Sequence, residues 1–159
     1  GQGTAAEAEV PALVDSMIAH TKARSSALGQ PITLIGWSLG GFVAREVARD
    51  LPDHVEQVIT MGSPVIGGPK YTTIAPLFKA RKFDLDRVEA EIKRRFTVPI
   101  QQPITAIYSR RDGVVGWGAA IDRDSPNVRH IEVSVSHMGL GLNAMVWGLV
   151  QDALASHRA

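Results

Sequence analysis

A short apolar run that ends in a glycine-rich turn constrains the fold of this chain more than any other feature. Residues 32–36 are rich in apolar and β-branched side chains, and Ser38 then lies between Gly36 and Gly40. Apolar residues recur beyond the turn with helical spacing, at Val43, Ala44 and Val47. The segment therefore predicts a buried strand, a tight turn that carries a serine, and a helix.

The pattern G-x-S-x-G has a physical reason in this setting. A chain that passes from strand to helix in so few residues is expected to hold Ser38 in a strained backbone conformation. Side chains at positions 36 and 40 are expected to collide with their neighbours, so that glycine is required at both. The turn would lift the Ser38 hydroxyl beyond the strand, where the Leu39 N–H and the helix dipole can meet a developing oxyanion. A chance match is the alternative, which the flanking strand and helix oppose.

Strands and helices alternate along most of the 159 residues. The hydrophobic pattern predicts helices over 11–29, 39–51 and from about Leu142 onward, a short helix near Val115, and strands over 32–36, 55–61, 104–108 and 128–135. This succession predicts a single α/β domain over residues 1–159, with about four parallel strands, right-handed crossovers and flanking helices.

Residues 69–100 interrupt this alternation. Apolar residues lie there at helical spacing within a highly charged segment, at Leu85, Val88, Ile92 and Phe96. One interpretation is a solvated surface helix that packs on the core by this stripe, and the other is a small lid or cap insertion over the site. The sequence leaves both open.

Three chemically active side chains follow predicted strands, at Ser38, Asp112 and His137. In a parallel sheet, sites gather beyond the carboxyl ends of the strands. A serine hydroxyl is a weak nucleophile until a base removes its proton, histidine does this best near neutral pH, and a buried carboxylate fixes the tautomer of the histidine. Both residues could also have non-catalytic roles: Asp112 could simply form a turn with Gly113, and His137 could be structural. Asp122 and Asp124 are rival carboxylates in the same half of the chain.

Four motifs are spread over nearly the whole chain. They are Gly36-Trp37-Ser38-Leu39-Gly40-Gly41, Met61-Gly62-Ser63-Pro64, Tyr108-Ser109-Arg110-Arg111-Asp112-Gly113-Val114-Val115 and Ser136-His137-Met138-Gly139-Leu140. Together they resemble the α/β-hydrolase superfamily, specifically bacterial esterases and lipases, and the chain order Ser, Asp, His is the one expected there. The resemblance implies a minimal α/β-hydrolase fold with Ser38 as nucleophile and His137 as general base and acid. It also implies that Asp112 orients the histidine and that the Leu39 N–H is one oxyanion donor.

The chain resembles the carboxyl-terminal portion of such hydrolases, without the amino-terminal strands. One helix precedes the 32–36 strand, and no His-Gly or glycine-rich loop occurs before Ser38 beyond Gly1-Gln2-Gly3. In the family, such a loop normally supplies the second oxyanion N–H, and losing one donor costs a factor of about 10²–10³ in rate. We expect a slow catalyst unless a backbone donor of the 62–68 loop or of the amino-terminal segment substitutes.

The absence of those strands also predicts an open sheet edge along residues 32–36. An apolar edge strand that nothing covers favours pairing with another chain. We therefore expect a homodimer or higher oligomer through this edge, or an amino-terminal partner fragment that covers it.

The sequence as a whole predicts a serine hydrolase that cleaves carboxylic esters through an acyl-enzyme on Ser38, with short-to-medium acyl groups favoured. Apolar residues near the predicted strand ends could line an acyl site, although core packing explains each equally well; they include Trp37, Val65, Trp117 and Met138. An acyltransferase or a thioesterase would use the same three groups. Outside these enzymes, the alternatives are a non-catalytic binding or assembly module with the hydrolase fold, or a half-enzyme that needs an amino-terminal partner.

Composition argues against several other classes of function. The net charge is +1 and the basic residues are spread out apart from the 79–95 region, so we expect no nucleic-acid partner. The chain has no cysteine, and its histidines and carboxylates lack ligand-like grouping, so we expect neither thiol chemistry nor a metal nor a cofactor. No apolar run reaches membrane-spanning length and no signal peptide is visible, which favours a cytoplasmic protein.

Overall fold

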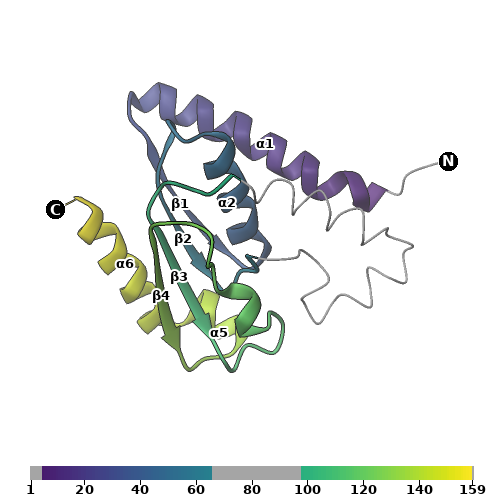
Figure 1. Cartoon of the computed structure of the whole chain (residues 1–159), viewed down its shortest axis with the longest axis vertical. Helices are drawn as coiled ribbons and strands as arrows, with labels where there is room; N and C mark the ends of the chain where they lie inside the picture. The colour runs from purple at the N-terminus through teal and green to yellow at the C-terminus, as the bar shows by residue number, and fades with distance from the viewer. Residues whose placement is uncertain (1–4, 66–97, 159) are drawn as a thin grey trace.

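The computed structural model describes residues 5–65 and 98–158, and the fold is built from these two ranges (Figure 1). The segment predicted as a surface helix or a lid, 69–100, lies outside them apart from its last residues. Both of its interpretations, and the extent of the domain over 1–159, therefore stay predictions.

Four parallel strands form one sheet, in the order β1-β2-β3-β4. The strands are β1 (Ile32–Trp37), β2 (Val55–Met61), β3 (Ile104–Ser109) and β4 (Val128–Val133). The carboxyl ends of all four strands lie at the same end of the sheet, where Met61 pairs with both Trp37 and Ile107. The predicted α/β class with about four parallel strands is therefore confirmed.

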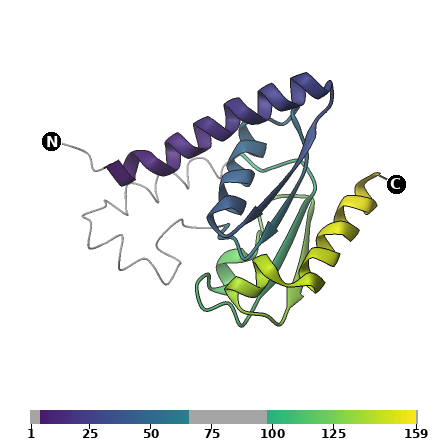
Figure 2. The same ribbon diagram turned by 180° about the vertical axis from the view of Figure 1, so that it is seen from behind.

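Helices cover both faces of this sheet (Figures 1 and 2). They are α1 (Ala5–Leu28), α2 (Leu39–Asp50), the 3₁₀ helix η2 (Trp117–Ala120), α5 (His137–Leu142) and α6 (Ala144–Arg158). α1 and α2 bury one core with Val58, and α5 and α6 bury a second core with Ile59. Successive residues of a strand point to opposite faces, so β2 contributes to both cores. Within the described ranges, none of the helices has the length and apolar character needed to cross a membrane.

Two helices differ from their predicted bounds. The first begins at Ala5 rather than at Pro11, because the Ala- and Glu-rich residues before the proline have high helix propensity. The last helix, predicted from about Leu142 onward, is α6 and begins at Ala144; the sequence does not predict α5 before it. Asn143 lies between the two helices, and its side-chain Oδ1 accepts the Met145 N–H at 2.8 Å. An asparagine that caps a helix in this way favours a new helix start over a continuous helix.

β4 ends at Val133 rather than at the predicted Val135. The Ser109 Oγ donates to the Val135 carbonyl oxygen at 2.6 Å and accepts the Val135 N–H at 3.3 Å. Because a side chain has taken both backbone groups, they are not available to the β3 backbone, and the ladder stops before them.

The turn between β1 and α2 is packed so closely that two of its glycines are required. A Cβ on Gly36 would overlap the backbone of Gly40, and a Cβ on Gly41 would overlap the Ser63 side chain. A Cβ on Gly40 would meet no atom within 4 Å. The predicted collision is therefore correct for position 36 and wrong for position 40, because the close approach to the neighbouring loop falls one residue later, at Gly41.

A buried ion pair joins α2 to the connection between β3 and β4. The Arg45 Nη2 donates to the Asp122 Oδ2 at 2.5 Å, and both side chains are almost fully buried. The Asp122 Oδ1 accepts the N–H groups of Asp124 and Ser125. Burial raises the pKa of the Asp122 carboxyl, but the charge of Arg45 and these hydrogen bonds outweigh burial and lower the pKa from 3.8 to about 2. Asp122, a rival carboxylate in the sequence, therefore has its partner on α2.

β1 forms an edge of the sheet, since among the described strands it pairs with β2 alone. The strand contains no charged residue and no proline, and Ile35 is 41% exposed. Charges and prolines are the usual devices that discourage edge pairing. The predicted association through this edge stays a prediction, which the second experiment below addresses.

We predict that alanine at two adjacent glycines of the turn affects the free energy of unfolding differently. Gly41→Ala places a Cβ against Ser63 and should lower the free energy of unfolding by about 1–3 kcal/mol. Gly40→Ala adds a Cβ that meets no atom in the first turn of a helix. It should therefore leave the free energy of unfolding unchanged or raise it by up to about 1 kcal/mol. Chemical denaturation of the two variants measures the difference, and equal stabilities would contradict the packing of the turn.

We predict that the chain self-associates, with two copies pairing their β1 edges about a two-fold axis. Sedimentation analysis at micromolar concentration should show a dimer or a higher oligomer. Ile35→Lys should shift the distribution toward monomer, because a lysine beside an edge discourages pairing. Val98→Lys changes an exposed apolar residue before β3 and is the control. A compact monomer in the unmodified chain would count against association.

We predict that Asp122 contributes stability that is lost in acid. Its pKa is lowered, so this stability is complete above about pH 4 and disappears as the pH falls toward about 2. Asp122→Asn should lower the free energy of unfolding near neutral pH by about 2–3 kcal/mol, since Arg45 then stays buried without its counter-charge. The variant should also lose less stability than the unmodified chain between pH 4 and pH 2. Denaturation across this range measures both effects, with the exposed Asp124→Asn as control; parallel curves would argue against the ion pair.

Candidate active site

Ser38 lies in the turn between β1 and α2, at the carboxyl end of β1. Its φ is 55° and its ψ is −125°, and it is the one non-glycine residue with positive φ in the described ranges. Such a conformation costs about 1–3 kcal/mol and persists only where the surroundings enforce it. Here the Ser38 N–H donates to the Met61 carbonyl oxygen at 2.9 Å, which ties the turn to the end of β2.

His137 and Asp112 form a buried hydrogen-bonded pair. The His137 Nδ1 lies 2.8 Å from the Asp112 Oδ2, and the two side chains are 11% and 2% exposed. Asp112 follows β3 and His137 begins α5 after β4, so these neighbouring strands bring together residues 25 apart in the sequence. An ionised carboxylate only accepts hydrogen bonds, so the pair assigns the imidazole proton to Nδ1 and leaves Nε2 as the basic nitrogen.

Backbone groups hold the Asp112 side chain in this position. Its Oδ1 accepts the N–H groups of Val114 at 2.8 Å and Val115 at 2.9 Å. The ordinary turn interpretation of Asp112 and its predicted contact with the histidine are therefore compatible. One oxygen closes the turn at Asp112, and the other accepts from His137.

Gly62 and Ser109 support this pair, a role that the sequence did not suggest for either residue. Gly62 has a φ of 55°, and a Cβ there would lie 2.9 Å from the Asp112 Oδ2 and 3.4 Å from the His137 Nδ1. Ser109 binds both backbone groups of Val135 and so joins the loop of Asp112 to the segment before His137. Both residues occur in the family-like motifs, but their contacts cross the sheet, which the pattern of a single segment does not encode.

Ser38 and His137 lie at the same edge of the sheet, and Trp37 connects their segments. The Trp37 Nε1 donates to the His137 carbonyl oxygen at 3.1 Å. Within the described residues, the His137 imidazole is hydrogen-bonded to Asp112, and no hydrogen bond joins it to the Ser38 hydroxyl. Such contacts are often long in a site without substrate and tighten when substrate binds. The structure therefore contains the Asp112–His137 hydrogen bond but no hydrogen bond between the Ser38 hydroxyl and the His137 imidazole.

Backbone N–H groups that could stabilise an oxyanion lie at the start of α2, which begins at Leu39. The first N–H groups of a helix have no acceptor within it. The loop after β2 is one of the two places where the sequence offered a substitute for the second donor, and there the N–H groups of Gly62 and Val65 already donate to backbone carbonyls. Position 64 is a proline, so Ser63 is the remaining donor in the described part of that loop.

The four predicted substrate-binding residues lie in different settings. Val65 is buried in the core, whereas Trp117 and Met138 are exposed. The Arg110 guanidinium lies 4.4 Å from the centroid of the Trp117 ring. Trp37 is partly buried, and its ring packs toward the His137 imidazole. Met138 and Trp117 thus offer apolar surface, and the binding role of all four stays a prediction.

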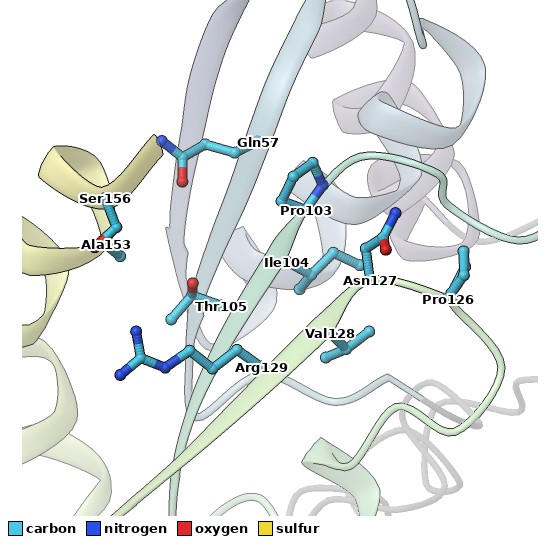
Figure 3. A pocket seen from close by; sticks show the side chains of 10 residues that line it. All are labelled: Gln57, Pro103, Ile104, Thr105, Pro126, Asn127, Val128, Arg129, Ala153 and Ser156. Carbon is cyan, nitrogen blue, oxygen red and sulfur yellow. The ribbon is translucent and has the colours of Figure 1, made fainter. Parts of the chain in front are cut away.

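A separate groove lies near the opposite end of the sheet, beside the amino-terminal parts of β2, β3 and β4 and the end of α6 (Figure 3). Its volume is about 370 Å³, and its lining includes Gln57, Thr105 and Arg129. None of the three predicted catalytic groups lines it. Because parallel sheets bind ligands beyond the carboxyl ends of their strands, this groove is not part of the candidate site.

The chemistry that these groups offer is nucleophilic and acid–base. A hydroxyl, an imidazole held by a carboxylate, and free N–H groups at a helix start are the parts that acyl transfer requires. In the parts of the chain that the structure covers, no three or more His, Asp or Glu side chains are grouped so that they could hold a metal ion.

Known proteins resemble this chain in sequence. Residues 14–89 match a family model described as the alpha/beta hydrolase fold. The chain is 28% identical over 127 residues to the pimeloyl-[acyl-carrier protein] methyl ester esterase of Vibrio parahaemolyticus, over 77% of this chain and 46% of the relative. The protein of the same name from Aliivibrio salmonicida is 29% identical over 91 residues, which are 57% of this chain and 32% of the relative. The chain therefore spans about half the length of the curated relatives it matches, or less.

Solved structures resemble it as well. The monoacylglycerol lipase of Paleococcus ferrophilus matches with a TM-score of 0.64 and 14% identity, over 91% of this chain and 76% of that one. A lipase-esterase related protein of Clostridium acetobutylicum matches with a TM-score of 0.65 and 14% identity, over 92% and 74%. Identities this low show the fold alone. With the four parallel strands, the G-x-S-x-G turn after β1 and the family match together, the chain has the α/β-hydrolase fold and resembles that superfamily.

Proposed function

We propose that this chain is a serine hydrolase that cleaves carboxylic esters through an acyl-enzyme on Ser38. The observation that carries the proposal is the buried Asp112–His137 hydrogen bond, at the same edge of the sheet as the strained Ser38 turn. In this arrangement a base can activate the serine while a carboxylate holds the base. The names of similar proteins, an esterase and a lipase, also support ester cleavage.

The first half of the reaction forms the acyl-enzyme. The Ser38 Oγ attacks the ester carbonyl carbon while the His137 Nε2 takes the hydroxyl proton, and the Asp112 carboxylate stabilises the resulting imidazolium through Nδ1–H. The carbonyl oxygen becomes an oxyanion that the Leu39 N–H and the positive end of α2 stabilise. The bond to the alcohol oxygen then breaks, and His137 returns the proton to the departing alcohol.

The second half releases the acid. The His137 Nε2 removes a proton from a water molecule, whose oxygen attacks the acyl carbonyl carbon. The bond to the Ser38 Oγ breaks, His137 protonates that oxygen, and the carboxylic acid leaves. An acyltransferase would use another nucleophile in place of water, and a thioesterase would release a thiol in the first half, with the same three groups.

A non-catalytic module, or a half-enzyme that needs a partner, is the second candidate. The observation that favours it is the loop after β2, where the N–H groups of Gly62 and Val65 are already bound to carbonyls. A site that lacks its second oxyanion donor is slower by a factor of about 10²–10³. The strained backbone of Ser38 favours the enzyme, because a binding module has no evident use for a costly conformation at a serine.

Titration with a fluorophosphonate probe, with the labelled residue located by mass spectrometry, tests the proposal. We expect stoichiometric labelling at Ser38, no labelling of Ser38→Ala, and unchanged labelling of the control Ser134→Ala, an exposed serine beyond β4. Asp112→Asn keeps an oxygen for its two backbone partners but can no longer hold His137 in the correct tautomer. It should slow labelling by about 10²–10⁴-fold.

A folded wild-type chain that remains unlabelled would overturn the enzyme proposal for this chain and leave the non-catalytic module, or the half-enzyme that needs a partner, in its place. Labelling that persists in Ser38→Ala would also overturn it. Circular dichroism of each variant distinguishes loss of chemistry from loss of fold.

A further inference from the structure

Trp37 makes two contacts with His137, although it belongs to the segment that carries Ser38. Its Nε1 donates to the His137 carbonyl oxygen at 3.1 Å. Its ring lies 5.4 Å from the imidazole, centroid to centroid, with 34° between the planes. The side chain next to the candidate nucleophile thus contacts both the backbone and the ring of the candidate base.

The fold leaves room for this contact at Gly141, which belongs to α5, the helix that His137 begins. A Cβ on Gly141 would lie 2.9–3.2 Å from three atoms of the Trp37 ring. Such distances are shorter than ordinary contacts, so a side chain there would push the indole away. The indole therefore packs directly against the backbone of α5.

Asp112 and Trp37 hold His137 in different ways. Asp112 binds Nδ1, which sets the tautomer and the rotation of the imidazole. Trp37 binds the carbonyl of the same residue, which fixes the His137 backbone relative to the turn of Ser38. Loss of the Trp37 hydrogen bond would therefore move the histidine relative to the serine while the Asp112–His137 pair stays intact.

We propose that Trp37 is a positioning residue that sets the distance between the His137 imidazole and the Ser38 hydroxyl. The inference rests on the proposed function, and it gives Trp37 a different role from the substrate contact that the sequence suggested. Acylation depends steeply on this distance, because a displacement of about 1 Å can lower a rate about 10²-fold. A residue that positions the base affects the rate of bond formation, whereas a residue that binds substrate affects affinity.

Trp37→Phe removes the indole N–H and keeps an aromatic ring. Labelling with the fluorophosphonate at several concentrations separates the dissociation constant of the reagent, KI, from the rate constant of bond formation, kinact. We expect kinact to fall about 10- to 100-fold while KI stays within about twofold of the wild-type value. The pH profile of kinact should keep its midpoint, because Asp112 still holds His137.

Gly141→Ala tests the same contact from the other side. Its Cβ displaces the indole, so kinact should fall although Trp37 itself is unchanged. Gly148→Ala, in α6, places a Cβ where no atom lies within 4 Å and is the matched control, with kinact expected within about twofold of wild type. Thermal unfolding of each variant shows whether the fold is retained, and Gly141→Ala decides the question if Trp37→Phe does not fold.

The outcomes separate this inference from the proposed function. A wild-type chain that is not labelled at Ser38 would overturn both. If the wild-type chain is labelled but kinact of Trp37→Phe stays within about twofold, the inference alone is overturned. A change confined to KI would also overturn it and would make Trp37 a substrate contact.

Discussion

The close packing of the turn between β1 and α2 is the constraint on which the rest of the site depends. Gly36 lies against the first turn of α2, and Gly41 lies against Ser63 in the loop after β2. This packing, with the hydrogen bond from the Ser38 N–H to Met61, holds Ser38 in a conformation that costs about 1–3 kcal/mol. The fold can bear this cost because α2 is buried over the whole stretch from position 41 to 48.

Hydrogen bonds connect the three segments that carry the candidate catalytic groups. Trp37 joins the turn of Ser38 to α5, and Asp112 joins the loop after β3 to the same helix. Ser109 strengthens the second connection through the backbone of Val135. Because each segment is held by another, a displacement of one is resisted by the rest, as in other buried polar networks.

Asp112 and Asp122 show how two similar carboxylates acquire different roles. Each closes a turn with one oxygen, by accepting the N–H groups two and three residues later. The second oxygen decides the role, since in Asp112 it meets an imidazole and in Asp122 it meets the guanidinium of Arg45. A carboxylate beside a guanidinium has a lowered pKa and a structural partner, whereas one beside an imidazole can steady a base.

The sequence by itself determined the strands, the helix after the serine turn and the parallel sheet, because these follow from local hydrophobic period and turn residues. It also singled out Ser38, Asp112 and His137, since the carboxyl ends of parallel strands must meet. Only the tertiary structure decided that Gly41, and not Gly40, is packed too closely for a side chain. It also decided where β4 stops and how Trp37 lies against α5. Those features depend on distances between segments far apart in the chain, and the pattern of any single segment does not contain them.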